Sequence, residues 1–149
     1  MPVFTLSYHS RNLIEDLTMD SLSALEDLLQ VSRARNASLG VTGALLFNEG
    51  RFLQLLEGDE ASVRAIYNSI VRDRRHADVT LISAEPGTAR RFARWSMAFV
   101  GMSRPARDYY RRFAVENEAE RTRVSVEALC NLLTRLLTLD AEAMSGRDG

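Results

Sequence analysis

The sequence contains no lysine, only one cysteine and no long apolar run. Because Cys130 is alone, no disulfide can form within the chain, which is typical of a reducing compartment. The first residues carry neither a basic segment nor a long apolar one, so we expect no signal peptide. No stretch approaches the roughly 18 apolar residues of a membrane span. These absences predict a cytoplasmic protein without a membrane partner.

The charges of the chain are nearly balanced. All 19 basic side chains are arginine, 20 side chains are acidic, and the formal net charge is -1. A strongly basic surface is therefore not predicted, and we expect no nucleic acid as a standing partner. The length of 149 residues and the hydrophobic fraction of 46% predict one domain with a sizeable core.

The spacing of apolar residues predicts seven elements in the order strand, helix, strand, strand, helix, strand, strand, and then two more helices. Asp20 and Asp59 are expected to cap the first two helices, and Gly40 is expected to end the first. The order matches an α+β ferredoxin-like sheet with two helices on one face and one extra strand. The predicted ranges are 3–8, 21–36, 41–47, 51–57, 60–73, 79–85, 95–100, 103–116 and 126–139.

The third strand predicts that both faces of the sheet are covered. In RFLQLLE (51–57), Phe52 and Leu56 point to one side, whereas Leu53 and Leu55 point to the other. A sheet with one face in water would alternate apolar and polar residues instead. We therefore expect the two C-terminal helices to cover the face opposite the first two helices.

Two polar side chains are predicted within the apolar layer of the sheet. Gln54 lies between Phe52 and Leu56, and burying an unpaired amide costs about 1–3 kcal/mol. Tyr8 ends the first strand, on the face of Phe4, and its hydroxyl also needs a partner when buried. Either Tyr8 and Gln54 satisfy each other or the backbone, or both point at a flat ligand held between the two helices.

Four segments together resemble the BLUF family of blue-light receptors that use FAD. They are RNASLGVTGALLFNEGRFLQLLEG (35–58), Tyr8 followed by Ser10, RDRRH (72–76) and RRFARWSM (90–97). Each segment alone is a weak signal, but their order and spacing are specific, and the resemblance covers about residues 3–100. It implies a flavin-binding domain over 1–100, a helical cap over 101–140 and a flexible tail over 141–149.

The resemblance implies a flavin held without a covalent bond between the two helices, either FAD or the smaller FMN or riboflavin, and no metal. Tyr8 would be the photochemical electron donor, and Gln54 would bridge it to the flavin. Light would drive electron and proton transfer from the tyrosine, and the glutamine would end with a new hydrogen bond to the C4 carbonyl. Asn36 matches the amide that binds ring atom N3 and the C4 carbonyl. Arg35 stands where many members carry asparagine or histidine, and would reach the C2 carbonyl.

Other positions match the family as ring walls, as contacts of the flavin's C2 side and phosphate-bearing chain, as a polar network, or as signalling residues. Each of them also has an ordinary reading, as core or as solvated surface. Trp95 and Met97 are expected on one face of the last strand. The ring walls are Val41, Leu45 and Phe52, and the contacts of the C2 side and the phosphate-bearing chain are Arg75 and His76. The polar network is Ser10 and Ser32, and the signalling residues are Trp95 and Met97.

The resemblance is to short members of the family, so we expect no enzymatic activity and a separate protein partner, with self-association into a homo-oligomer also expected. The arginine cluster within 90–94 is interpreted as a solvated loop. One alternative is a ferredoxin-like enzyme resembling acylphosphatases, although the segment 7–11 lacks the glycine of a phosphate loop. Another is a regulatory domain that binds no flavin.

Overall fold

The computed structural model describes residues 3–12, 19–48, 51–72, 76–87, 89–100, 103–116 and 126–147 of the chain. The strands and helices follow one another in the predicted order, so the sequence of elements is confirmed. Their bounds are β1 Val3–Asn12, α1 Met19–Ser38, β2 Thr42–Asn48, β3 Arg51–Gly58, α2 Glu60–Arg72, β4 His76–Gly87, β5 Ala98–Val100, α3 Arg104–Glu116 and α4 Val126–Arg147.

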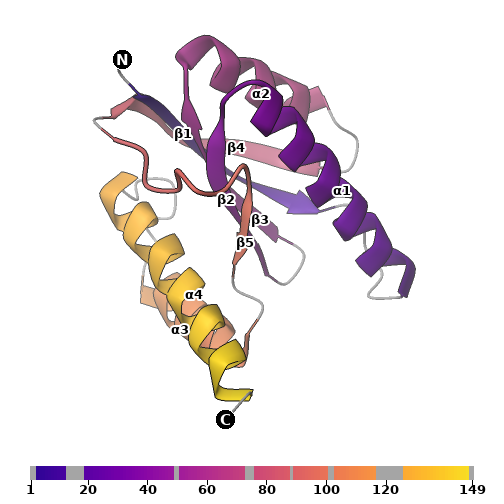
Figure 1. Ribbon diagram of the computed structural model, residues 1–149, viewed down its shortest axis with the longest axis vertical. Coiled ribbons are helices and arrows are strands. Elements are labelled where there is room, and N and C mark those ends of the chain that lie inside the picture. The colour runs from indigo at the N-terminus through magenta and orange to yellow at the C-terminus, as the bar shows by residue number, and fades with distance from the viewer. Residues whose placement is uncertain are drawn as a thin grey trace.

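The five strands form one sheet in the order β4-β1-β3-β2-β5. Strand β1 is antiparallel to β3 and β4, and β2 is antiparallel to β3. The order 4-1-3-2 is that of a ferredoxin-like sheet, to which β5 is added parallel to β2. The predicted fold class is therefore confirmed. Figure 1 shows α1 and α2 on one side of the sheet and α3 and α4 on the other.

Helix α1 ends where Gly40 was predicted to stop it. The N–H of Val41 donates to the carbonyl of Asn36 at 2.8 Å, and the N–H of Gly40 donates to Ala37 at 3.2 Å. Gly40 has a φ of 67°, which a residue without Cβ adopts at no steric cost. This pair of bonds is a Schellman motif. It fixes the main chain around Asn36 and leads the chain directly into β2.

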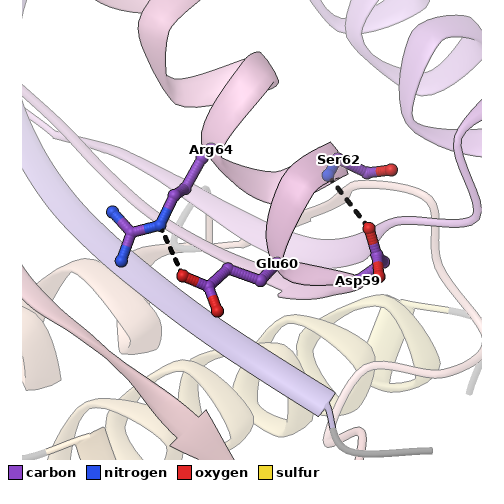
Figure 2. Close-up of polar contacts among 4 residues, drawn as sticks. All are labelled: Asp59, Glu60, Ser62 and Arg64. Atoms are coloured by element: carbon purple, nitrogen blue, oxygen red, sulfur yellow. Dashed lines mark hydrogen bonds and ion pairs between the residues drawn. The ribbon is translucent and has the colours of Figure 1, made fainter.

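Helix α2 begins at the predicted cap. The Asp59 carboxylate accepts a hydrogen bond from the N–H of Ser62 at 3.3 Å, and Glu60 pairs with Arg64 one turn later at 2.8 Å (Figure 2). Helix α1 differs slightly, because it begins at Met19 and so includes Asp20 in its first turn.

Each face of the sheet carries its own apolar core. The core under α1 and α2 includes Phe52 and Leu56 of β3, whereas the core under α3 and α4 includes Leu53 and Leu55 of the same strand. The prediction that both faces are covered is therefore confirmed. Among the residues that the structure describes, no helix is both long and apolar enough to span a membrane.

The C-terminal helix is longer than predicted. Helix α4 continues to Arg147, so residues 141–147 are helical where a flexible tail was expected. The alanine, glutamate and methionine residues of this stretch favour a helix. Asp140 also holds the helix in place, because its carboxylate accepts a hydrogen bond from the N–H of Ser103 at 2.9 Å, just before α3.

Strand β4 forms an irregular edge of the sheet. Its pairing with β1 shifts register between Ser7 and Tyr8 and again between His9 and Arg11. Asp78 has a positive φ of 53°, which few residues other than glycine adopt. The strand was predicted over 79–85 and extends through Pro86, which lies opposite Phe4.

Candidate functional site

The strand register places the central site residues in one row across the sheet. Gln54 of β3 lies opposite Tyr8 of β1 on one side and opposite Leu45 of β2 on the other. Side chains at paired positions point to the same face, which here is the face under α1 and α2. Tyr8 and Gln54 are only 1% and 3% exposed. A phenol and a carboxamide are thus brought together inside an apolar layer.

The carboxamide of Gln54 has one strong and one weak hydrogen-bond partner. The hydroxyl of Tyr8 donates to Gln54 Oε1, and Gln54 Nε2 contacts Met97 Sδ at 3.3 Å. Thioether sulfur is a weak acceptor, so the amide N–H side is held only loosely. The Tyr8 ring also packs against the ring of Tyr67 from α2, with centroids 5.6 Å apart and planes at 56°. Burial raises the pKa of the Tyr67 phenol.

Asn36 is fully buried near the end of α1, in the turn that the Schellman motif fixes. Its Nδ2 donates to the carbonyl of Ser96 at 2.8 Å. Its Oδ1 is buried and has no hydrogen-bond partner among the described residues. An unsatisfied buried acceptor costs about 1–3 kcal/mol, so a ligand N–H at this point would be stabilising.

The segment before β5 is held by hydrogen bonds to its main-chain carbonyls, from donors in β2 and α1. Gly43 N donates to the carbonyl of Trp95 at 3.1 Å, and Arg33 Nε donates to the carbonyl of Met97 at 3.0 Å. Gly43 must be glycine here, because an added Cβ would lie 2.1 Å from the carbonyl oxygen of Leu55. With the Asn36 bond, three successive carbonyls are occupied, and regular strand pairing begins only at Ala98.

These bonds correct the prediction of a strand over 95–100 with Trp95 and Met97 on one face. Strand β5 spans only Ala98–Val100, and the side chains of Trp95 and Met97 lie in different environments. Met97 is 1% exposed and touches Gln54, whereas Trp95 is 37% exposed. Two-residue alternation fails because side chains of α1 take the carbonyls that a ladder would use.

On the opposite face, the buried carboxylate of Glu57 binds the loop that leads to this segment. Glu57 is 1% exposed and accepts hydrogen bonds from the N–H of Arg91 at 2.8 Å, the N–H of Phe92 at 2.7 Å and the hydroxyl of Thr42 at 2.8 Å. Arg90 donates to the same Thr42 hydroxyl at 3.0 Å. The sequence analysis did not identify Glu57.

The loop is also joined to the C-terminal helices. Arg91 Nη2 pairs with Glu127 Oε2 in the first turn of α4 at 2.6 Å, and the ring of Phe92 is buried in the core under α3 and α4. The interpretation of this arginine cluster as a solvated loop therefore holds for the exposed Arg91 and Arg94, and it is wrong for Arg90, which is half-buried and bonds to Thr42.

The family model described as "Sensors of blue-light using FAD" matches residues 3–98, which is more than half of the chain. The chain belongs to this family. The match spans every strand of the sheet up to the start of β5, and it contains the Tyr8–Gln54 pair. The predicted resemblance to BLUF proteins is therefore confirmed, and the chain carries a blue-light sensor domain.

Curated relatives match over the sensor region. The chain is 35% identical over 89 residues to the blue light- and temperature-regulated antirepressor BluF of Escherichia coli (strain K12), covering 60% of this chain and 22% of that protein. It is 39% identical over 62 residues to photoactivated adenylate cyclase subunit alpha of Euglena gracilis, covering 42% and 6%. The chain thus spans less than a quarter of the length of these two relatives.

Solved BLUF structures match over nearly the whole chain. The dark-state structure of BlrB, titled a BLUF protein, is 30% identical with a TM-score of 0.71, and the match covers 92% of this chain and 96% of that one. The photo-activated state of BlsA is 26% identical with a TM-score of 0.75, covering 91% and 94%. These matches include the C-terminal helices as well as the sheet.

The remaining BLUF positions are distributed as follows. The predicted ring walls are all buried in the core under α1 and α2, as Val41, Leu45 and Phe52. Ser10 and Ser32 are buried, and Arg35 is half-buried in the last turn of α1. His76 begins β4, and its side chain is not described. Arg75 lies outside the described residues.

The described residues fit a flavin ring better than they fit a metal ion. Asn36 offers a buried, unused acceptor, and the core under α1 and α2 is apolar. Within the described ranges, no group of three or more potential metal ligands is found. The segment 7–11, considered above as a phosphate loop, lies inside β1.

Proposed function

We propose that this chain binds a flavin without a covalent bond between α1, α2 and the sheet, and that Tyr8 and Gln54 form its light-responsive pair. The supporting observation is the buried Tyr8–Gln54 hydrogen bond, on the same face as the unsatisfied Oδ1 of Asn36. FAD is the flavin of the family description, and FMN or riboflavin would present the same ring.

A bound flavin supplies the blue-light absorption and accepts an electron. Tyr8 supplies that electron and the hydroxyl proton, which Gln54 Oε1 already receives as a hydrogen bond. A carboxamide suits the relay, because it has a donor on one side and an acceptor on the other. The electron and the proton would then return to Tyr8, and the rearranged Gln54 amide would donate a new hydrogen bond to the C4 carbonyl of the oxidised ring. Absorption would move to longer wavelength.

The weak bond from Gln54 to Met97 lets the amide change its orientation. Leaving a thioether sulfur costs little, whereas leaving an oxygen acceptor would cost a full hydrogen bond. Met97 is thus the first side chain outside the pair whose contacts change when Gln54 rearranges. Trp95 lies two residues earlier and reports the same event from a half-exposed position.

The binding residues are proposed from their match to the family. Asn36 Oδ1 would accept from ring N3, and Arg35 would contact the C2 carbonyl. Arg75 and His76 would lie near the C2 side and the phosphate-bearing chain, and Ser10 and Ser32 would belong to the polar network. The ring would be enclosed by Val41, Leu45 and Phe52.

We assign the output to a separate protein partner, with no enzymatic activity in the chain itself. The family match ends at residue 98, and the two helices that follow cover the sheet face opposite the proposed flavin. The relatives include a blue light-regulated antirepressor and a photoactivated adenylate cyclase subunit, so different outputs accompany one sensor. A homo-oligomer would offer a second route for the same signal.

The test is the absorption spectrum of the purified protein before and after blue light. A yellow protein with a reversible red shift is expected, and Tyr8→Phe and Gln54→Leu should each keep the colour and lose the shift. Tyr109→Phe and the exposed Gln30→Leu are the matched controls and should cycle normally.

Three results would contradict parts of the proposal. Normal cycling in Tyr8→Phe or Gln54→Leu would remove those residues from the mechanism. A folded but colourless protein that takes up no added FAD, FMN or riboflavin would support a flavin-free regulatory domain. Turnover of an acyl phosphate would support the enzymatic alternative.

A further inference from the structure

Two groups of bonds hold the loop that carries Trp95 and Met97. Before the loop turns, Glu57 binds the main chain at Arg91 and Phe92. The turn itself is closed by the N–H of Trp95, which donates to the carbonyl of Phe92 at 3.0 Å. After the turn, β2 and α1 bind the next three carbonyls. Glu57 therefore acts on the loop from the sheet face opposite Gln54.

The two side chains of the loop are chemical competitors for Gln54. Met97 Sδ can only accept weakly from Gln54 Nε2. The indole N–H of Trp95 can only donate, and beside Gln54 it would need Oε1 as its acceptor. They lie two residues apart, roughly 6–7 Å along an extended chain, so the loop must shift by about that length to exchange one for the other. The orientation of Gln54 therefore depends on where the loop is anchored.

We propose that Glu57 is a positioning residue that keeps Met97, and not Trp95, beside Gln54. Both oxygens of its carboxylate bind main-chain N–H groups of the loop, and Thr42 adds a third donor. Without the carboxylate, the buried N–H of Phe92 and the part-buried N–H of Arg91 lose their acceptor, and the loop would be free to turn its indole inward. The consequence for the light cycle rests on the proposed function, but the position of Trp95 does not.

The first measurement is the fluorescence of Trp95, the only tryptophan of the chain, in protein stripped of flavin. Glu57→Gln keeps the shape but sets an NH₂ group against one N–H of the loop. We expect its emission to move to shorter wavelength and its quenching by acrylamide to fall. Thr42→Val removes one donor from Glu57 and should give a smaller change in the same direction.

The control for charge is Glu60→Gln on α2. Glu60 is an exposed glutamate whose partner is the side chain of Arg64 and not the loop (Figure 2). Its substitution should leave the emission of Trp95 unchanged. If Glu57→Gln and Thr42→Val also leave emission and quenching unchanged, the proposal is wrong.

The second measurement is the rate at which the flavin-loaded protein recovers in the dark. Glu57→Gln should change this rate about fivefold, the factor that one buried hydrogen bond is worth. Because Glu57 acts through Met97, it should have no further effect in a Met97→Ala background. Additive effects of the two substitutions would overturn the proposal. If the wild-type protein shows no light shift, the proposed function fails, and the fluorescence of Trp95 still decides the role of Glu57.

Discussion

Strand β3 presents one buried polar side chain to each face of the sheet, and the two differ in how they are held. Gln54 faces α1 and α2 and bonds only to side chains, a phenol and a thioether. Glu57 faces α3 and α4 and bonds to two main-chain N–H groups and a hydroxyl. Side-chain partners can rotate, whereas main-chain partners are fixed by the fold. One face is thus built for rearrangement and the other for anchoring.

The largest test of this comparison replaces each of the two side chains by leucine. Glu57→Leu should lower the free energy of unfolding by about 4 kcal/mol, because one buried and two part-buried donors lose their acceptor. Gln54→Leu should lower it by less, about 1–3 kcal/mol, because only the Tyr8 hydroxyl loses a strong partner. Urea unfolding of flavin-free protein measures both. Equal losses at the two positions would show that the faces do not differ.

A second test sharpens the description of the rearrangeable face. Asn36→Ala removes the unsatisfied Oδ1, together with the bond to Ser96. We expect flavin affinity to fall about tenfold, as for one or two hydrogen bonds of about 1 kcal/mol each. Equilibrium dialysis against riboflavin measures the change, and Asn131→Ala on an exposed turn of α4 is the control. Affinity equal to that of the control would remove Asn36 from the binding site.

The smallest test concerns the anchored face. Burial raises the pKa of the Cys130 thiol to about 11, from an ordinary value of 9.0. Between these values the unfolded chain releases the thiol proton and the folded chain keeps it, so stability falls as pH rises through this window. The fall in the unfolding free energy between pH 8 and 10 should therefore be shallower in Cys130→Ala. Parallel curves would show that this thiol does not titrate differently in the folded protein.

Most of the fold could be predicted because local patterns and global packing agree. Gly40, Asp59 and the apolar periods marked the ends and faces of elements correctly, and the two apolar sides of 51–57 predicted both cores. The position of Tyr8 opposite Gln54 agrees with the prediction, because the alternation of side chains along each strand places both on the same face of the sheet.

The parts that sequence could not predict depend on contacts between distant segments. Glu57 looks like an ordinary acid at a strand end, and only the loop 34 and 35 residues later makes it a buried anchor. Trp95 and Met97 part because α1 binds carbonyls about 60 residues away along the chain. The last turns of α4 were missed because their polar composition outweighed their helix propensity.

The irregular edge of β4 has a consequence for how copies of the molecule can meet. A long straight edge strand exposes a row of main-chain donors and acceptors onto which another chain can add. Here two register shifts, the positive φ of Asp78 and the imino nitrogen of Pro86 interrupt that row. Growth of a continuous intermolecular sheet from this edge is therefore disfavoured.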